Sequence, residues 1–299
     1  MEATPTRGRG SVPTGFHGVV YTRHTVCKEQ LTSLLPSARP RRRRIRISGL
    51  VGAALLGLAL EFAHAATGTT APVRPTHFTL EIVLAGRQTQ VDVSAPVGAT
   101  RPSRDAVIFA HGFTRSRDSM AGHAAAFAHL GLWAVAPDLP YLMDSRDNAR
   151  ALRELILALR AGVAGEPLER LVLVGFSAGG LAAILAADSP GVVGYIGLDP
   201  FDRPGGVGLE AARRLQIPVW LLRGPSAGCN AYAIAEPWVA ALPNLVLDRV
   251  LTEASHCDFE DPTDRLCQFV CGRADPVRQA AVQAFLLEAV RGALATPRQ

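Results

Sequence analysis

The sequence predicts an α/β domain built on a mostly parallel sheet, and three observations lead to this fold class. Short apolar runs alternate with helical segments from residue 106 to the carboxyl end of the chain, as in folds whose parallel strands are joined by helices. The apolar runs are continuous, which is typical of strands buried on both faces. A content of 48% hydrophobic and 19% charged residues is that of a globular protein.

A β-hairpin is expected before this alternation. Residues 76–84 and 88–93 are short, partly alternating runs, and Ala85-Gly86-Arg87 separates them, which indicates two antiparallel strands joined by a turn. Parallel strands are then predicted at 106–110, 132–136, 171–174, 192–198, 219–222 and 245–251. Helices are predicted at 119–130, 145–164, 178–187, 208–215, 231–242 and 276–294, with a cysteine-rich loop before the last helix.

The first 65 residues indicate an N-terminal extension and secretory signal peptide. An arginine-rich segment, 41–46, precedes an apolar run over 47–60 and then Ala63-His64-Ala65, a pattern that signal peptidase cleaves. The apolar run is too short to span about 30 Å of hydrocarbon as a helix, so no stable membrane insertion is expected. We therefore expect a secreted or periplasmic protein, whose single domain covers residues 66–299.

The basic charge of the chain is concentrated in that extension. Of the 31 Lys and Arg and 26 Asp and Glu residues, ten and three lie in residues 1–65, which leaves an excess of two acidic residues in the body. Binding of nucleic acid requires an excess of cations on one face. No nucleic-acid partner is therefore expected.

The sequence contains one G-x-S-x-G motif in the context expected of a nucleophilic serine, Gly175-Phe176-Ser177-Ala178-Gly179. An apolar strand is predicted before it and an alanine-rich helix after it, the context in which G-x-S-x-G presents a reactive serine on a tight turn. Such a serine needs a base, and His256 lies on a loop after the last predicted strand. Ser177 and His256 are therefore the candidate nucleophile and base.

The base needs a carboxylate to orient it, and Asp199 ends the predicted strand that follows the nucleophile helix. The next strand has no carboxylate nearby, so Asp199 is favoured and Asp202 is the reserve candidate. His111-Gly112-Phe113 follows the first parallel strand. From that position, the backbone N–H groups of Phe113 and Ala178 are expected to form the oxyanion hole.

These ordered motifs resemble the α/β-hydrolase superfamily over residues 100–299. Gly197-Leu198-Asp199-Pro200 and the loop Gly228-Cys229-Asn230 are similar to the pattern of the chlorophyllase and platelet-activating-factor-acetylhydrolase-like branch. The resemblance implies an α/β-hydrolase fold and an exported serine esterase that needs no metal or other cofactor. Its partner would be a small-molecule or lipid-like ester.

Three alternatives stay open at this point. Polyester or cutinase-like hydrolysis is one, although cutinase relatives usually place the acid one strand later. Amide or dienelactone-type hydrolysis is another, but dienelactone hydrolases use Cys where this chain has Ser177. A secreted binding protein without turnover is the third, and it would be expected to lack part of the catalytic set.

Four cysteines follow the extension, and an oxidising compartment makes disulfides plausible. Cys229 and Cys257 are expected on loops after neighbouring strands, where a bridge would hold the His256 loop. Cys267 and Cys271 are expected to form a second, local bridge. Their spacing matches no zinc motif.

Overall fold

A computed structural model describes residues 76–97 and 103–295, all of which belong to one unit, Ala66–Gln299. The predicted signal peptide lies outside the described residues. Eight strands form one sheet in the order β1-β2-β4-β3-β5-β6-β7-β8. The strands are β1 His77–Leu84, β2 Arg87–Ser94, β3 Asp105–Ala110, β4 Trp133–Pro137, β5 Arg170–Phe176, β6 Val192–Leu198, β7 Val219–Arg223 and β8 Leu245–Val250.

The predicted hairpin is present, and the rest of the sheet is parallel. Strand β1 pairs antiparallel with β2, and β2 pairs antiparallel with β4. From β4 through β3 to β8, every neighbouring pair is parallel. Ala85 and Gly86 form the hairpin turn with φ of 49° and 80°, the left-handed pair that suits the twist of a two-residue connection.

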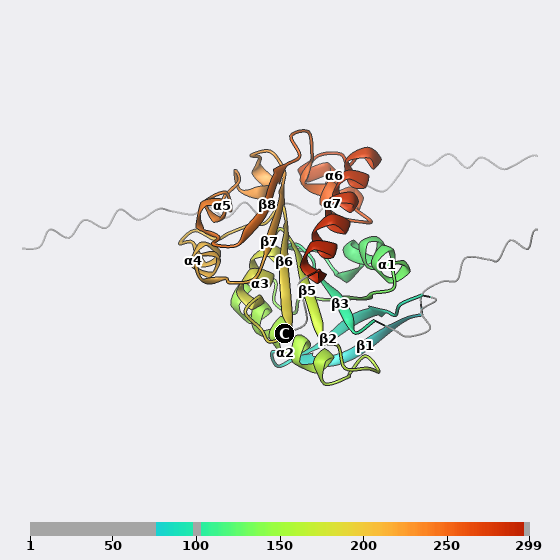
Figure 1. The fold of residues 1–299 in the computed structure, drawn as a ribbon. Helices are drawn as coiled ribbons and strands as arrows, with labels where there is room; N and C mark the ends of the chain where they lie inside the picture. The colour runs from blue at the N-terminus through green and yellow to red at the C-terminus, as the bar shows by residue number, and fades with distance from the viewer. Residues whose placement is uncertain (1–75, 98–102, 296–299) are drawn as a thin grey trace, which may run out of the picture. The chain divides into compact units, whose positions relative to one another are not determined.

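Helices cover both faces of this sheet (Figure 1). They are α1 Ala121–His129, α2 Ser145–Arg160, α3 Ala178–Ala186, α4 Val207–Arg214, α5 Pro237–Ala241, α6 Arg265–Cys271 and α7 Pro276–Leu294, with short 3₁₀ turns η1 Arg117–Met120, η2 Gly228–Asn230 and η3 His256–Phe259. Side chains of α2 to α5 pack in one core layer, and side chains of α1 and α7 pack in the other.

Strand β3 shows how the sequence produces two cores. Ile108 and Ala110 face the layer under α2 and α3, while Val107 and Phe109 face the layer under α1 and α7. All six residues of this strand are buried. The run 106–110 is apolar at every position and therefore satisfies both faces, as its lack of alternation predicts.

Two predicted elements differ from the structure. The helix expected over 231–242 is confined to α5, because Ala231, Tyr232 and Ala233 have φ near +50° to +60° and cannot continue a right-handed helix. The segment expected as a cysteine-rich loop contains η3 and the seven-residue helix α6. No helix in the described ranges combines the length and apolar character needed to cross a bilayer.

Candidate active site

Ser177 occupies a strained turn between β5 and α3. Its φ is 52° and its ψ is −121°, a region that costs a non-glycine residue about 1–3 kcal/mol. A Cβ on Gly175 would lie 2.5 Å from the Gly180 Cα, and a Cβ on Gly179 would overlap the backbone of Ala110 and His111. The glycines of the motif are therefore required by close backbone packing, which lifts Ser177 at the carboxyl end of the strand.

Five segments that are far apart in the sequence meet at this edge, because parallel strands place their carboxyl ends on the same side of a sheet. The loop 111–113 follows β3, Ser177 follows β5, and Asp199 follows β6. The loop with Asn230 follows β7, and His256 opens η3 after β8. The topology thus gathers the predicted residues at one rim.

His256 contacts Asp199 directly. The distance from His256 Nδ1 to Asp199 Oδ2 is 2.6 Å. An ionised carboxylate can only accept a hydrogen bond, so Nδ1 carries the proton and Nε2 is left as an acceptor. The His256 ring also packs against Phe176, with ring centroids 4.6 Å apart. The imidazole is therefore fixed in tautomer and in position.

The Asp199 carboxylate is held by further donors. The Gly224 N–H donates to Oδ1 at 2.9 Å, and Asn230 Nδ2 lies 3.2 Å from Oδ1 and 3.4 Å from Oδ2. Asn230 is itself fixed, because its Nδ2 donates to the Pro225 carbonyl and its Oδ1 accepts from the Ala227 and Ala233 N–H groups. Asp199 is buried, with 3% of its surface exposed.

Asp202, the reserve candidate, lies in a different environment. Its carboxylate accepts hydrogen bonds from the backbone N–H groups of Arg203, Gly208 and Leu209 and from Trp238 Nε1, at 2.7–2.9 Å. These four donors occupy the carboxylate and tie the start of α4 to α5. The structure brings Asp199, and not Asp202, to the histidine.

The two backbone N–H groups predicted for the oxyanion hole border the same cavity as Ser177. Phe113 and Ala178 both line it, and neither N–H has a hydrogen-bond partner among the described residues. The N–H of Ala178 is unpaired because it belongs to the first turn of α3.

A buried histidine fixes the loop of Phe113. His111 Nε2 accepts a hydrogen bond from the Leu139 N–H, so its protonated Nδ1 donates to the Gly112 carbonyl. Burial lowers the pKa of His111, which keeps the ring neutral and able to make both bonds. This histidine is committed to the loop and is not available as a base.

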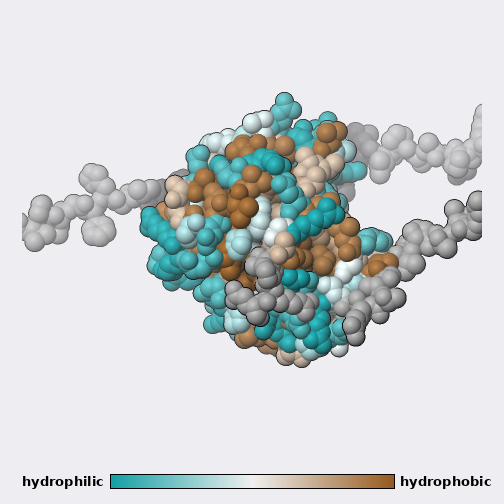
Figure 2. Space-filling model, in the orientation of Figure 1, coloured by the Kyte–Doolittle hydropathy of each residue, from teal (hydrophilic) through white to brown (hydrophobic). Residues whose placement is uncertain are grey.

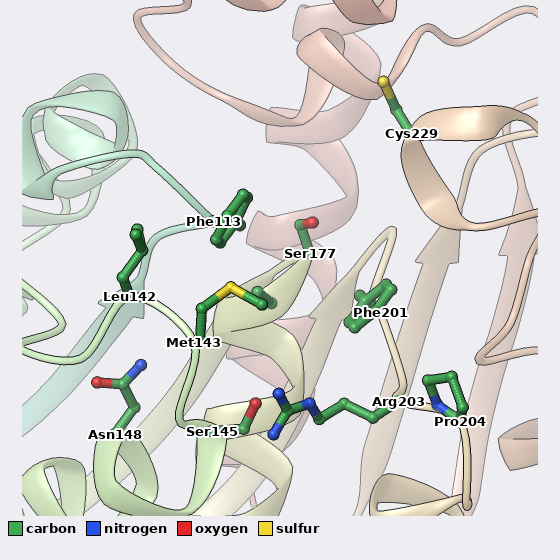
Figure 3. Close-up of a pocket in the computed structure, with 11 residues that line it drawn as sticks. Phe113, Leu142, Met143, Ser145, Asn148, Ser177, Phe201, Arg203, Pro204 and Cys229 are labelled. Carbon is green, nitrogen blue, oxygen red and sulfur yellow. The ribbon is translucent and has the colours of Figure 1, made fainter. Parts of the chain in front are cut away.

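Two cavities open beside Ser177. The first, of about 400 Å³, is bordered by Phe113, Phe201 and the 142–148 segment and appears in Figure 3. The second, of about 330 Å³, is bordered by His256, Phe176 and helix α6. Ser177 lines both cavities. Within the described chain, no hydrogen bond joins the Ser177 hydroxyl to His256, although both side chains border the second cavity.

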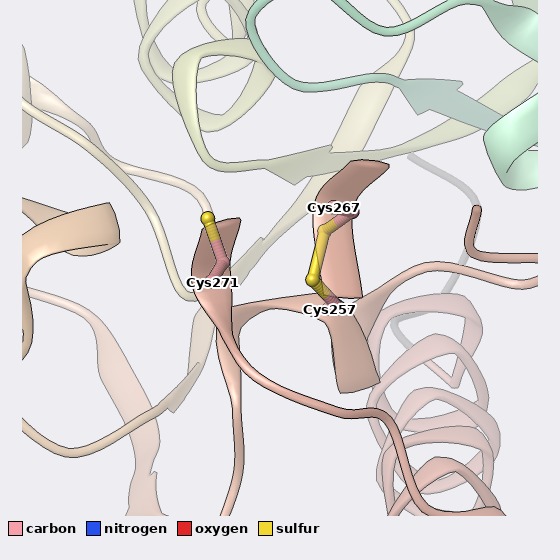
Figure 4. A group of neighbouring side chains, drawn as sticks. All are labelled: Cys257, Cys267 and Cys271. Atoms are coloured by element: carbon pink, nitrogen blue, oxygen red, sulfur yellow. A yellow bond between two sulfur atoms is a disulfide. The ribbon is translucent and has the colours of Figure 1, made fainter. Parts of the chain in front are cut away.

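The cysteines form two disulfides, but the predicted pairing is wrong. The bridges are Cys229–Cys271 and Cys257–Cys267. The sulfurs of Cys257, Cys267 and Cys271 lie within 4.8 Å of one another, so the direction of each side chain, and not proximity, selects its partner. Helix α6 supplies that direction: it turns Cys267 toward Cys257, while the sulfur of Cys271 points away from that pair (Figure 4).

The disulfides fasten α6 beside the candidate site. Cys257 is the neighbour of His256, and Cys229 is the neighbour of Asn230. Helix α6 also exposes the apolar side chains of Leu266, Phe269 and Val270, and Figure 2 shows hydrophobic atoms gathered over the region of this helix. Paired sulfurs offer no thiolate, so the cysteine group is not a metal centre in this state.

Sequence reasoning does not identify the contact of Asn230 with Asp199. Its position in a loop after the strand next to that of Asp199 is the available signal, since loops after neighbouring parallel strands meet at one edge. The buried ion pair beside the second cavity was also not expected. There Arg115 Nε binds Glu260 Oε1 at 2.6 Å, and burial raises the pKa of Glu260 against the opposing effect of Arg115.

No family model matches the sequence, and no curated protein matches it. Solved structures do match. A dienelactone hydrolase from Anabaena variabilis has a TM-score of 0.58 at 20% identity, covering 74% of this chain and 99% of that one. The peroxisomal α/β-hydrolase Lpx1 from Saccharomyces cerevisiae has a TM-score of 0.55 at 11% identity, over 76% and 92%. Est1E from Butyrivibrio proteoclasticus has a TM-score of 0.52 at 16% identity, over 71% and 99%.

These similarities agree with the topology of the sheet, the strained turn at Ser177 and the order of the loops along the rim. At such identities they establish the architecture. The protein therefore has the α/β-hydrolase fold.

Proposed function

We propose that the protein is a serine hydrolase that cleaves carboxylic esters through an acyl-enzyme. The observation that carries this proposal is the 2.6 Å contact from His256 Nδ1 to Asp199 Oδ2, which leaves Nε2 as an acceptor on a cavity that Ser177 also lines. An oriented imidazole beside an elbow serine is the arrangement that activates a hydroxyl. Ser177 is the nucleophile, His256 the base and Asp199 the acid of this proposal.

In the first step, His256 Nε2 takes the proton of Ser177 as the Oγ attacks the ester carbonyl. The negative oxygen that develops is stabilised by the N–H groups of Phe113 and Ala178, whose lack of other partners supports this role. His256 then gives the proton to the departing alcohol. In the second step, water takes the place of the alcohol, and His256 deprotonates this water as it attacks the acyl carbonyl. The bond to Ser177 Oγ then breaks, Oγ regains a proton from His256, and the acid is released.

The first step requires the Ser177 hydroxyl to reach His256, and in this proposal a rotation of the serine side chain, which an incoming substrate can favour, brings it there. Catalytic hydrogen bonds are often long before substrate binds. The tilted packing of the imidazole on Phe176 limits the movement of the base. We therefore assign the adjustment to Ser177.

We propose that the protein is related to the chlorophyllase and platelet-activating-factor-acetylhydrolase-like branch of these hydrolases. Its support is the position of the acid, Asp199, directly after the strand that follows the nucleophile helix. The loop with Cys229 and Asn230, which resembles the pattern of that branch, contacts this acid. The substrate would then be a small or lipid-like ester.

Export is part of the proposal. Two disulfides suit an oxidising compartment, and residues 41–65 have the features of a cleaved signal. We propose a secreted or periplasmic protein that begins near Ala66 after cleavage. Amino-terminal sequencing of the exported protein tests this, and an intact Met1 end would contradict it.

Hydrolysis of p-nitrophenyl esters of graded acyl length tests the activity. Ser177→Ala should lower kcat at least about 10⁴-fold, since loss of a nucleophile removes the acyl-enzyme route. Ser189→Ala is the matched control, because the hydroxyl of the buried Ser189 donates only to the Ala186 carbonyl, and Ser189 lines neither cavity. Ester turnover that survives Ser177→Ala would refute the mechanism, and turnover of anilides alone would change the substrate class.

A further inference from the structure

The first cavity beside Ser177 changes character along its length. Near Ser177 it is bordered by the apolar side chains of Phe113, Met143 and Phe201, whereas Arg203 borders its other end (Figure 3). Figure 3 shows the Arg203 guanidinium directed toward Ser145, on the side of the cavity away from the Ser177 hydroxyl. A bound molecule that reaches from the nucleophile to this end would therefore pass from an apolar to a cationic environment.

Arg203 is unusual among the arginines of this protein. It is half-buried, yet in residues 76–97 and 103–295 it is the one half-buried arginine whose side chain has neither a hydrogen-bond nor an ion-pair partner. The other six each have a partner: Arg115 binds Glu260, Arg117 binds Asp138, Arg160 binds the Glu169 carbonyl, Arg170 binds Asp105, Arg223 binds Asp248, and Arg278 binds Asp258.

The nearby carboxylates make their hydrogen bonds to other groups. Asp144 caps α2 by accepting hydrogen bonds from the N–H groups of Arg146 and Asp147. The Asp147 N–H foremost, and the charge of Arg203 to a smaller extent, lower the pKa of Asp144, but no ion pair joins Asp144 to Arg203 in the described residues. Asp202 uses its carboxylate on four other donors. The guanidinium thus keeps its donors for a group from outside the protein.

From this arrangement we infer that Arg203 is a specificity-determining residue that binds a carboxylate on the substrate. The preferred ester has an apolar arm that ends in a carboxylate, such as a monoester of a straight-chain dicarboxylic acid. A guanidinium donates two parallel hydrogen bonds to a carboxylate, and the Ser145 hydroxyl, which has no hydrogen-bond partner among the described residues, borders the same end of the cavity. This inference rests on the proposed ester hydrolysis.

The test compares two p-nitrophenyl esters of equal length, one ending in a carboxylate and one ending in the neutral carboxamide. Acyl chains of six or more carbons prevent the free carboxylate from attacking its own ester through a small ring, and the rate with Ser177→Ala is subtracted as background. We expect the wild-type kcat/KM to be about tenfold higher for the carboxylate, through a lower KM, the size expected of one charge-assisted bidentate contact. Added salt should reduce this ratio.

Substitution of Arg203 tests whether this residue causes the preference for the carboxylate ester. Arg203→Gln should bring the ratio close to one, and Arg203→Lys, which keeps the charge but loses the bidentate geometry, should retain part of it. Arg146→Gln is the charge-matched control. Arg146 is an exposed arginine at the start of α2, next to Ser145, and it does not line the cavity. It should leave the ratio unchanged. Urea unfolding midpoints confirm that the variants remain folded.

The inference is overturned if wild type prefers the carboxamide or shows no preference, or if Arg203→Gln leaves the ratio intact. It is also overturned if Arg146→Gln lowers the ratio as much as Arg203→Gln, since the effect would then come from overall charge. Failure of the proposed function gives a separate result. In that case, neither ester would be hydrolysed above the Ser177→Ala background.

Discussion

Asp199 and Asp202 are three residues apart, and both are almost completely buried, yet their surroundings differ. Asp202 is surrounded by three backbone N–H groups and an indole N–H, none of which ionises near neutral pH. Asp199 shares its carboxylate between a backbone N–H, an amide and the imidazole of His256. Burial is the same in the two cases, and the kind of partner is different.

What marks a buried carboxylate as a candidate for function is a titratable partner that itself borders a cavity. Asp202 has only fixed donors, which is the pattern of a residue that joins elements of the fold. Asp199 has one partner, His256, that faces the second cavity. Four sets of substitutions should separate the two roles, and the expected change in free energy falls from the first to the last.

Asp199→Asn should have the largest effect. Asparagine keeps the shape of the side chain but cannot hold His256 in the required tautomer or stabilise its charged form, so kcat/KM for ester hydrolysis should fall by roughly 10⁴-fold. Steady-state kinetics measure the loss, and the urea midpoint should change little by comparison. A loss smaller than that of Asp202→Asn would reverse our assignment of the two residues.

Replacement of Cys229 and Cys271 by alanine should destabilise the protein where the loop beside Asp199 is joined to helix α6. The bridge closes a segment with a sequence separation of 42, and its removal should lower the free energy of unfolding by about 4 kcal/mol in the loop-entropy treatment. Urea unfolding without reductant measures this. The Cys257 and Cys267 double variant is the reference, because its separation of 10 predicts a loss of about 3 kcal/mol. An unchanged midpoint in the first variant would contradict the expectation.

Asp202→Asn should lower the free energy of unfolding and have little effect on the rate of ester hydrolysis. The new amide would place donors against the N–H groups that the carboxylate now accepts, and an unsatisfied buried polar group costs about 1–3 kcal/mol. The free energy of unfolding should fall by that amount, while kcat per folded molecule falls far less than in Asp199→Asn. Denaturation and active-site titration of one preparation measure both quantities.

Asn230→Ala should have the smallest effect of the four. It removes one donor from Asp199 while His256 and Gly224 keep their contacts, so kcat should fall by roughly tenfold, the value of a single hydrogen bond to a charged group. KM should stay constant, because Asn230 lines neither cavity. A rise in KM with constant kcat would show that Asn230 acts on substrate binding and not on the acid.

The elements that were predicted well are those with continuous local signals. The apolar runs at β3, β5 and β6 and the elbow glycines around Ser177 specify their structure within a few neighbouring residues. The carboxyl-edge rule then brings Asp199 and His256 to the same rim without further information. Elements of this kind depend on short segments and on topology.

The features that could not be predicted from the sequence depend on short elements with weak local signals, or on contacts between distant segments. Helix α6 has only seven residues, too few for a clear periodic pattern, and without it the direction of Cys267 and Cys271 could not be inferred. The role of Asn230 was missed for a related reason, because it depends on how one loop folds back on Asp199. Arg203 could not be singled out, since the lack of a partner is a property of its whole surroundings.

The two bridges have a consequence for how the protein is made. Every cysteine that takes part lies between Cys229 and Cys271, downstream of the serine turn and of its acid. A polypeptide that emerges from its amino end can complete the central strands and the serine turn before the histidine segment exists. The His256 segment is then fixed last, by oxidation, so a truncated or reduced product would possess the proposed nucleophile without a firmly held partner for it.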